Sequence, residues 1–301
     1  MPIYLDHNGT TPHAPEVIKA MRPFLETHFG NPSSGHWYGI GPKKAVMAAR
    51  EQVAGILGCR ACEVLFTSGG TESNNQALKS IAGSRYARGN HIITSSIEHP
   101  AILEVCRFME GHGFAVTVLP VDGDGLVAVA DVAAAIRPDT ILITIMHANN
   151  EVGTIQPIAE IAALAREHGI LMHTDAAQSV GKIPTGVEEL GVDLLSVAGH
   201  KLYAPKGIGA LYIRDGVTAE VFCHGAGQED GRRAGTENVL EIVGLGKACE
   251  IAAGELEAHA AHMGAMRDRL EAGLEDALTE AVSYTHLTLP TKEDVCSGRG
   301  W

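Results

Sequence analysis

Residues 194–214, LLSVAGHKLYAPKGIGALYIR, contain two apolar runs on either side of a polar turn. The runs at 194–199 and 209–214 are short and apolar on both faces, which is typical of strands buried inside a sheet. The turn between them contains two lysines, Lys201 directly after His200 and Lys206 directly after Pro205. Either lysine is a candidate anchor for a covalently bound cofactor or an ordinary surface charge, and the surrounding sequence has to distinguish them.

Five earlier runs have the same character as these two, and helical patterns separate most of them. The predicted strands are 63–67, 91–96, 115–120, 141–146, 170–175, 194–199 and 209–214. The predicted helices between them include 42–57, 73–82, 100–111 and 157–168, the last with Pro157 in its first turn. Alternating strands and helices predict an α/β fold with a mainly parallel seven-stranded sheet sandwiched by helices. Ligands of such sheets bind at the carboxyl ends of the strands.

The last part of the chain has a different pattern. Residues 238–280 are mostly helical, with a one-sided apolar stripe that predicts a helix packed on the main domain. The stripe consists of Leu256, Met263, Met266, Leu270, Leu274 and Leu278. Residues 282–301 show neither a helical nor a strand period.

The composition indicates a globular protein with one large domain, or one large and one partial domain. The chain has 301 residues, 45% of them hydrophobic and 20% charged. Its formal charge of −13 argues against partners such as nucleic acid or an anionic membrane surface. No apolar run has the length of a membrane span, and the N-terminus lacks the features of a signal peptide. We therefore expect a cytoplasmic protein.

The cysteines and histidines suggest neither a disulfide framework nor a metal site. The six cysteines are scattered along the chain, and Cys59 and Cys62 form a C-x-x-C without a second ligand pair of comparable spacing. We interpret that motif as a loop before a strand. The fifteen histidines form no recognised metal-binding pattern, so no metal is predicted.

Polar residues follow five of the predicted strands. Gly70 and Thr71 open a helix after a glycine pair, which suits a phosphate but is equally an ordinary N-cap. Asn150 is a possible donor to an anion and equally a turn residue. The complete set of strand-end candidates is Gly70, Thr71, His99, Asn150, Asp175, Gln178, His200 and Lys201.

Pyridoxal 5′-phosphate is a cofactor that needs this combination. It requires a lysine for covalent attachment, an acid for its ring nitrogen and a cradle for its phosphate. It also requires a donor to its ring oxygen and a flat group against its ring. A dinucleotide is disfavoured, because GIGPKK at 39–44 lacks the third glycine of the fingerprint.

Eight motifs in order then closely resemble one family, the cysteine desulfurases and the related selenocysteine lyases. These are pyridoxal-phosphate enzymes of the class V aminotransferase group with the type I fold, and the resemblance covers about residues 3–280. The motifs are YLDHNGTTP, GNPSSGH, FTSGGTESNN, SSIEHPAI, MHANNEVGTIQPI, HTDAAQSVGK, GHKLYAPKGIGALYIR and GQEDGRRAGTENV.

The resemblance implies a role for each matching residue. It makes Lys201 the covalent anchor and a proton shuttle, and it leaves Lys206 as a turn residue. Lys201 and His99 are the implied catalytic residues. The implied cofactor contacts are Gly70, Thr71 and His200 at the phosphate, His99 on the ring, Asp175 at the ring nitrogen, Asn150 and Gln178 near the ring oxygen, and Thr236 at the phosphate of the neighbouring subunit of a homodimer.

The implied reaction removes sulfur from L-cysteine, giving L-alanine and an enzyme persulfide for a sulfur-acceptor protein, as in iron–sulfur cluster assembly. A selenocysteine lyase or another enzyme that cleaves C–S or C–Se bonds is the alternative, and a non-catalytic scaffold of the same fold is another. Three positions depart from the family pattern, since Ala198 and Ala234 replace the usual serines and Asp230 stands where an arginine is frequent.

The resemblance also implies a domain division. Residues 1–14 are an N-terminal segment of the small domain, 15–255 the large cofactor-binding domain and 256–281 the start of the C-terminal small domain. We expect 282–301 to be a tail foreign to the family. The family's persulfide-forming cysteine and substrate-carboxylate arginine have no matching position, and the surroundings of Cys296 do not match the catalytic-cysteine loop.

Overall fold

The computed structural model describes residues 3–278 and has one seven-stranded sheet. The strand order is β1-β7-β6-β5-β4-β2-β3, and β7 runs antiparallel to both of its neighbours while the other pairs are parallel. The strands are β1 Val64–Thr67, β2 His91–Ser95, β3 Ala115–Leu119, β4 Thr140–Thr144, β5 Leu171–Asp175, β6 Leu194–Ala198 and β7 Gly209–Ile213. The predicted mainly parallel sheet is confirmed, and all seven strands lie within a residue or two of their predicted positions.

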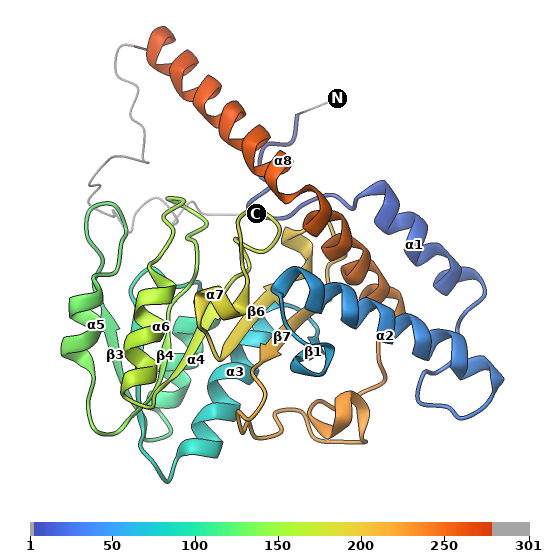
Figure 1. Cartoon of the computed structure of the whole chain (residues 1–301), viewed down its shortest axis with the longest axis horizontal. Coiled ribbons are helices and arrows are strands. Elements are labelled where there is room, and N and C mark those ends of the chain that lie inside the picture. Colours follow the sequence, from blue (N-terminus) through green and yellow to red (C-terminus); the bar gives the residue numbers. More distant parts are fainter. Residues whose placement is uncertain (1–2, 279–301) are drawn as a thin grey trace.

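Helices cover both faces of this sheet (Figure 1). Side chains alternate between the faces, so Val64 and Phe66 belong to one core and Leu65 to the other. Helices α3 and α4 cover the second core, and the other helices contribute to the first. The helices are α1 Pro15–Glu26, α2 Trp37–Leu57, α3 Gly70–Arg85, α4 Pro100–Glu110, α5 Val129–Ala135, α6 Ile158–Glu167, α7 Val187–Leu190 and α8 Val239–Ala277.

The predicted position of Pro157 is wrong by one residue. Helix α6 begins at Ile158, and Pro157 is its N-cap with a non-helical ψ of 59°. The ring of proline fixes φ near the helical value but leaves ψ free, so the residue precedes the helix instead of joining its first turn.

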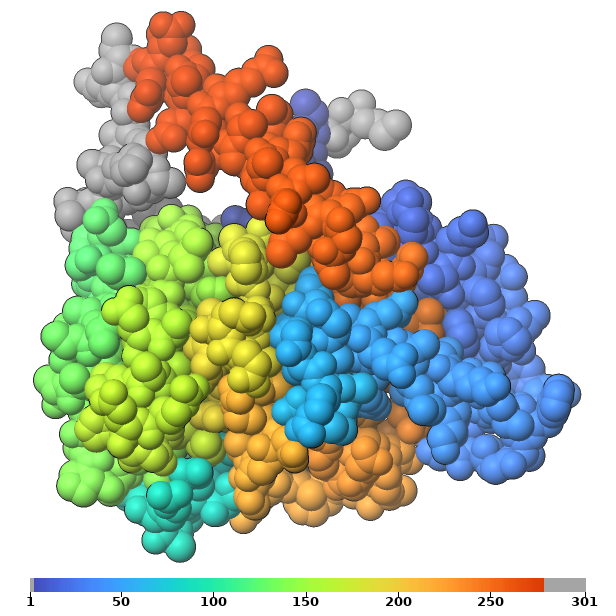
Figure 2. Space-filling model, viewed as in Figure 1, coloured from blue at the N-terminus to red at the C-terminus, as the bar shows by residue number. Residues whose placement is uncertain are grey.

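The prediction for the apolar stripe of 256–278 is also wrong. The first part of α8 packs against α1 and α2 and buries Leu245 and Cys249, but the second part projects away from the domain (Figures 1 and 2). Met263 and Leu270 are 42% and 64% exposed. The 39 residues of α8 make a rod of about 58 Å, against about 31 Å for the 21 residues of α2, so α8 extends past its neighbour.

Two other expectations concern the cysteines and the membrane. Cys59 directly follows α2, and Cys62 lies in the short 3-10 turn Ala61–Glu63 before β1, so the C-x-x-C motif is the predicted loop before a strand. The described cysteines form no disulfide with one another. Within residues 3–278, no helix is long and apolar enough to cross a membrane. Residues 282–301, expected to be foreign, and Cys296 lie outside the described residues.

A buried histidine joins the three central strands. His173 of β5 lies with Nδ1 2.8 Å from Thr144 Oγ1 of β4 and Nε2 3.0 Å from Ser196 Oγ of β6. The side chain is fully buried, and burial lowers its pKa from 6.5 to about 3. The imidazole is therefore neutral in the folded protein at pH values where it is charged in the unfolded chain.

This histidine should make the fold sensitive to acid. Between pH 6.5 and about 3 the unfolded chain binds a proton at His173 that the folded chain does not bind. The contribution of His173 to the free energy of unfolding is therefore fully present above pH 6.5 and is lost as the pH decreases through this window. The expected loss is on the order of 4 kcal/mol at the acidic end. Denaturant unfolding of the wild type and of His173→Gln, from pH 8 to pH 4, checks this. The variant should show a clearly weaker dependence, and equal slopes for the two proteins would contradict the assignment.

Candidate functional site

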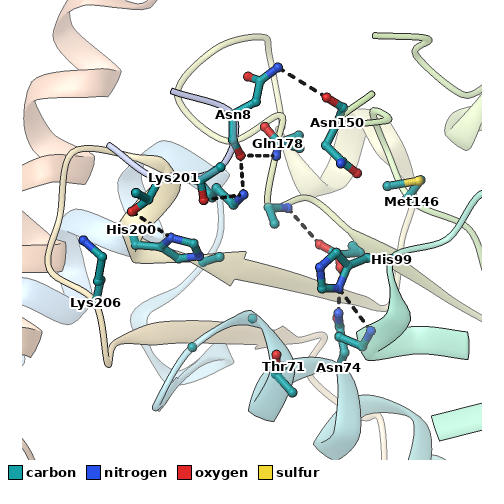
Figure 3. A pocket seen from close by; sticks show the side chains of 18 of the residues that line it. Asn8, Thr71, Asn74, His99, Met146, Asn150, Gln178, His200, Lys201 and Lys206 are labelled. Carbon is teal, nitrogen blue, oxygen red and sulfur yellow. Dashed lines mark hydrogen bonds between the residues drawn. The ribbon is translucent and has the colours of Figure 1, made fainter. Parts of the chain in front are cut away.

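A cavity of about 1200 Å³ opens at the carboxyl edge of the parallel strands (Figure 3). Eight of the nine residues predicted for the site line it: Gly70, Thr71, His99, Asn150, Asp175, Gln178, His200 and Lys201. Thr236 does not line this cavity and is exposed in the segment between the 3-10 turn Gln228–Gly231 and α8. The sequence therefore predicted a set of strand-end residues that the fold brings to one place.

Lys201 reaches the cavity from a tight turn. Strand β6 ends at Ala198 and continues into a 3-10 turn, Gly199–Lys201. A Cβ on Gly199 would lie 2.9 Å from the carbonyl oxygen of Ile208, so only glycine allows this close return of the chain. The Lys201 ammonium donates to the carbonyl oxygens of Asn8 and Gly9, the latter at 3.0 Å. The N-terminal segment therefore closes over the lysine.

The electrostatics of the cavity act on Lys201 in two directions. Partial burial lowers the pKa of its ammonium, and the carboxylates of Asp6, Asp175 and Glu151 oppose that shift. The net pKa is below the usual lysine value. A larger fraction of this lysine is thus the neutral, nucleophilic amine at neutral pH than for an exposed lysine.

Asp175 ends β5 with a buried carboxyl group. The residue is 5% exposed, and its oxygens accept from Asn74 Nδ2 at 2.6 Å and from the Ala177 amide at 2.9 Å. Burial raises the pKa of this carboxyl, and the two neutral donors and the charges of His99 and Lys201 only partly compensate. A cationic group placed beside Asp175 would remove that penalty.

The N-terminus of α3 forms another wall. Gly69 has a φ of 147°, and α3 begins at Gly70. A Cβ on Gly70 would lie 3.1 Å from the Ala198 Cβ, so a side chain here would crowd the wall of the cavity. The first N–H groups of a helix lack intrahelical acceptors and bear partial positive charge, which makes this end suitable for an anion.

Two histidines flank the cavity. His99 is the N-cap of α4, and its Nδ1 accepts from the Ala101 amide at 3.1 Å, which leaves the proton of the neutral ring on Nε2. His200 Nδ1 lies 3.2 Å from Thr10 Oγ1. Burial and the charges of Lys201 and Lys206 lower the pKa of His200, so its ring is mainly neutral at neutral pH.

The N-terminal segment, residues 5–10, connects the remaining lining residues. Gln178 Nε2 donates to the Asn8 carbonyl at 3.0 Å, and Asn8 Nδ2 donates to the Asn150 carbonyl at 3.3 Å (Figure 3). These contacts place Gln178 and Asn150 on one side of the cavity together with Lys201. The segment therefore forms one wall of the cavity and links these polar side chains by hydrogen bonds.

Comparison with known proteins agrees with this architecture. Residues 3–293 match the family model described as aminotransferase class-V. The chain belongs to the class-V aminotransferase family. It is 53% identical over 266 residues to the cysteine desulfurase IscS of Dictyoglomus turgidum, covering 88% of this chain and 68% of that protein. It is 53% identical to the cysteine desulfurase IscS of Methanosarcina thermophila, covering 90% and 67%.

Solved structures show the same similarity. A NifS-like protein superposes on this chain with a TM-score of 0.89 and 43% identity, covering 92% of this chain and 76% of the other. The structure described as SspA in complex with cysteine gives a TM-score of 0.81 and 47% identity, covering 83% and 72%. The chain spans about two thirds of the length of the curated relatives.

Sequence reasoning missed three features at or beside this cavity. Asn74, the partner of Asp175, lies one helical turn after Thr71, a spacing that could have revealed it. Glu98 is buried, accepts from Ser95 Oγ and the Met146 amide, and has its pKa raised to about 8 by burial. Lys206 is an exposed turn residue, as predicted, and it also lines the cavity at its rim, which the sequence did not indicate.

Proposed function

We propose that this protein is a pyridoxal-phosphate-dependent cysteine desulfurase, which removes sulfur from L-cysteine and releases L-alanine. The observation that supports this most is the cavity itself. It brings the Lys201 amine, the buried Asp175 carboxyl and the N-terminus of α3 together in a chain 53% identical to a cysteine desulfurase. A relative of known structure, described as a complex with cysteine, supports the choice of substrate.

The residues present fit pyridoxal 5′-phosphate. The Gly70 backbone leaves room at the positive end of α3 for a phosphate, with Thr71 and His200 beside it. Asp175 accepts only from neutral donors among the hydrogen bonds of the described chain, so its buried charge suits a protonated ring nitrogen. His99 would lie against the ring, Asn150 and Gln178 would face the ring oxygen, and Lys201 would form the covalent bond.

The bound cofactor would supply an electron sink for the pair of electrons left when the substrate loses its α-proton. The chain's own groups do the rest. The lowered pKa of Lys201 makes its Nζ both a nucleophile and a base that can hold the α-proton. Asp175 would hold a protonated ring nitrogen with its buried carboxyl group. The N-terminal segment 5–10 contributes backbone carbonyls that hold Lys201 and Gln178 in place.

Several further assignments belong to the same proposal. Thr236, exposed and away from its own cavity, would reach the phosphate in the second subunit of a homodimer. Residues 1–14 and 256–281 would belong to a small domain and 15–255 to the large one. The sulfur would pass to an acceptor protein in the cytoplasm, and the relatives named IscS support a role in iron–sulfur cluster assembly.

Uptake of the cofactor tests the proposal directly. When the purified protein is titrated with pyridoxal 5′-phosphate, a visible absorption band is expected to develop and to saturate at one equivalent of cofactor per chain. Borohydride should abolish the band and fix the cofactor covalently, as seen in the intact mass. A protein that binds no pyridoxal 5′-phosphate, or binds it without a borohydride-dependent mass increase, would rule out the proposed function.

A further inference from the structure

A third lysine, Lys182, contacts a residue that lines the cavity. Lys182 Nζ donates to Gln178 Oε1 at 2.8 Å, one helical turn away in sequence, and the lysine side chain is half-buried. Lys182 itself does not line the cavity. Its contact with Gln178 connects it to the residues that line the cavity.

The local backbone holds Lys182 in place. The amides of Lys182 and Ile183 donate to the Ser179 carbonyl at 2.9 and 3.0 Å. The preceding Gly181 has a φ of +76°, and a Cβ there would lie 2.1 Å from Leu202 Cδ1. The turn is therefore packed against the segment that follows Lys201, and only glycine fits at its tightest point.

The chemistry of the two side chains defines the direction of the amide. An ammonium group donates hydrogen bonds and cannot accept them. Lys182 can therefore pair only with the oxygen of Gln178, which turns Gln178 Nε2 toward the Asn8 carbonyl at 3.0 Å. A flipped amide would place its oxygen against the Asn8 carbonyl oxygen and its NH₂ against the ammonium, and both contacts would repel.

The arrangement also connects the two lysines. The Asn8 carbonyl accepts from both Gln178 Nε2 and Lys201 Nζ, so Lys182, Gln178, Asn8 and Lys201 form one hydrogen-bonded chain. Burial and the charge of Lys201 lower the pKa of Lys182 to about 8. Lys182 is therefore still mainly protonated at neutral pH, although burial disfavours its charged form.

We propose that Lys182 is a positioning residue, which fixes the amide of Gln178 so that its NH₂ group faces the cavity and donates to an oxygen of the ligand bound there. The identity of that ligand, pyridoxal 5′-phosphate, rests on the proposed function. The orientation of the amide does not, because it follows from contacts within the chain alone.

The first test uses the protein without ligand. In protein labelled with ¹⁵N-glutamine, the side-chain NH₂ resonances of Gln178 are assigned by their loss in Gln178→Ala. In the wild type these protons should exchange slowly with solvent. In Lys182→Met the resonances should shift and exchange at least about tenfold faster, and Lys182→Arg should restore slow exchange. Unchanged resonances in a folded Lys182→Met protein would overturn the proposal, and so would a failure of Lys182→Arg to restore them.

The second test uses the protein with bound pyridoxal 5′-phosphate. It distinguishes an effect of Lys182 through Gln178 from a direct effect of the lysine's charge on the cofactor. The pH midpoint of the visible band of the pyridoxal-phosphate complex should rise by about one unit in Lys182→Met. In the Gln178→Ala background, the same change should have little further effect, because Lys182 would act through Gln178. An equal shift in both backgrounds would show a direct charge effect and overturn the positioning role. Absence of any band in the wild type would instead contradict the proposed function, and the ligand-free measurement would still decide the role of Lys182.

Discussion

Replacing Lys201 by alanine is expected to abolish the covalent attachment of pyridoxal 5′-phosphate completely. Lys201 Nζ is the amine that the fold directs into the cavity, between the N-terminal carbonyls and the buried Asp175. Among the described residues that line the cavity, the other lysine is Lys206, which lies at the exposed rim. After incubation and borohydride reduction, mass spectrometry of the tryptic peptides should find the modification on Lys201 of the wild type and on no peptide of the variant.

Lys206 provides the matched control. It lines the same cavity from the exposed rim, five residues further along the chain. Lys206→Ala should therefore retain the visible band and the adduct at Lys201. A reducible band that persists in Lys201→Ala, or an adduct that moves to Lys206 in a protein with Lys201 intact, would show that the anchor has been assigned to the wrong lysine.

Replacing Asp175 by asparagine should reduce the removal of a substrate α-proton by at least about 10²-fold. The variant lacks the negative charge that would keep the ring nitrogen protonated. It also lacks an acceptor, because Asn74 Nδ2 and the Ala177 amide both donate to Asp175 and an amide can offer an oxygen to only one of them. The exchange of the α-proton of L-alanine with D₂O, followed by NMR, measures this step without requiring sulfur transfer.

The control for this variant is Asp193→Asn. Asp193 is another largely buried acid whose carboxyl accepts from the Met172 amide, but it lies outside the cavity. Its replacement should lower the stability of the fold and leave the exchange rate per bound cofactor near that of the wild type. If Asp175→Asn binds cofactor and exchanges the α-proton at the wild-type rate, Asp175 has no role at the ring nitrogen.

The sequence predicted the fold and most of the candidate site for local reasons. The apolar runs that end in Asp175 and Ala198 are short and lack a polar face, as strands covered on both sides must be. The carboxyl ends of parallel strands lie at one edge of the sheet, so strand direction alone predicts that the residues following these strands lie close together. Thr236 could not be tested by the same logic, since its proposed partner is on another subunit.

Contacts between distant segments could not be predicted in this way. Asn74 and Asp175 are 101 residues apart, and Gln178 and Asn8 are 170 apart. Each contact depends on how two finished elements pack, and no local propensity specifies that packing. The same applies to α8, whose apolar stripe has a helical period but is largely exposed in the described chain.

The two lysines of residues 194–214 show most clearly which features the sequence determines and which depend on the tertiary structure. The sequence alone determined that a lysine follows a buried strand at the edge where Asp175 and the glycine pair also lie, because strand direction and side-chain period are local properties. Only the tertiary structure decided that the N-terminal segment accepts a hydrogen bond from Lys201, that Lys206 lines the rim of the cavity, and that Lys182 donates to Gln178. These depend on long-range packing, in which the burial of one segment fixes the hydrogen-bond partners of another.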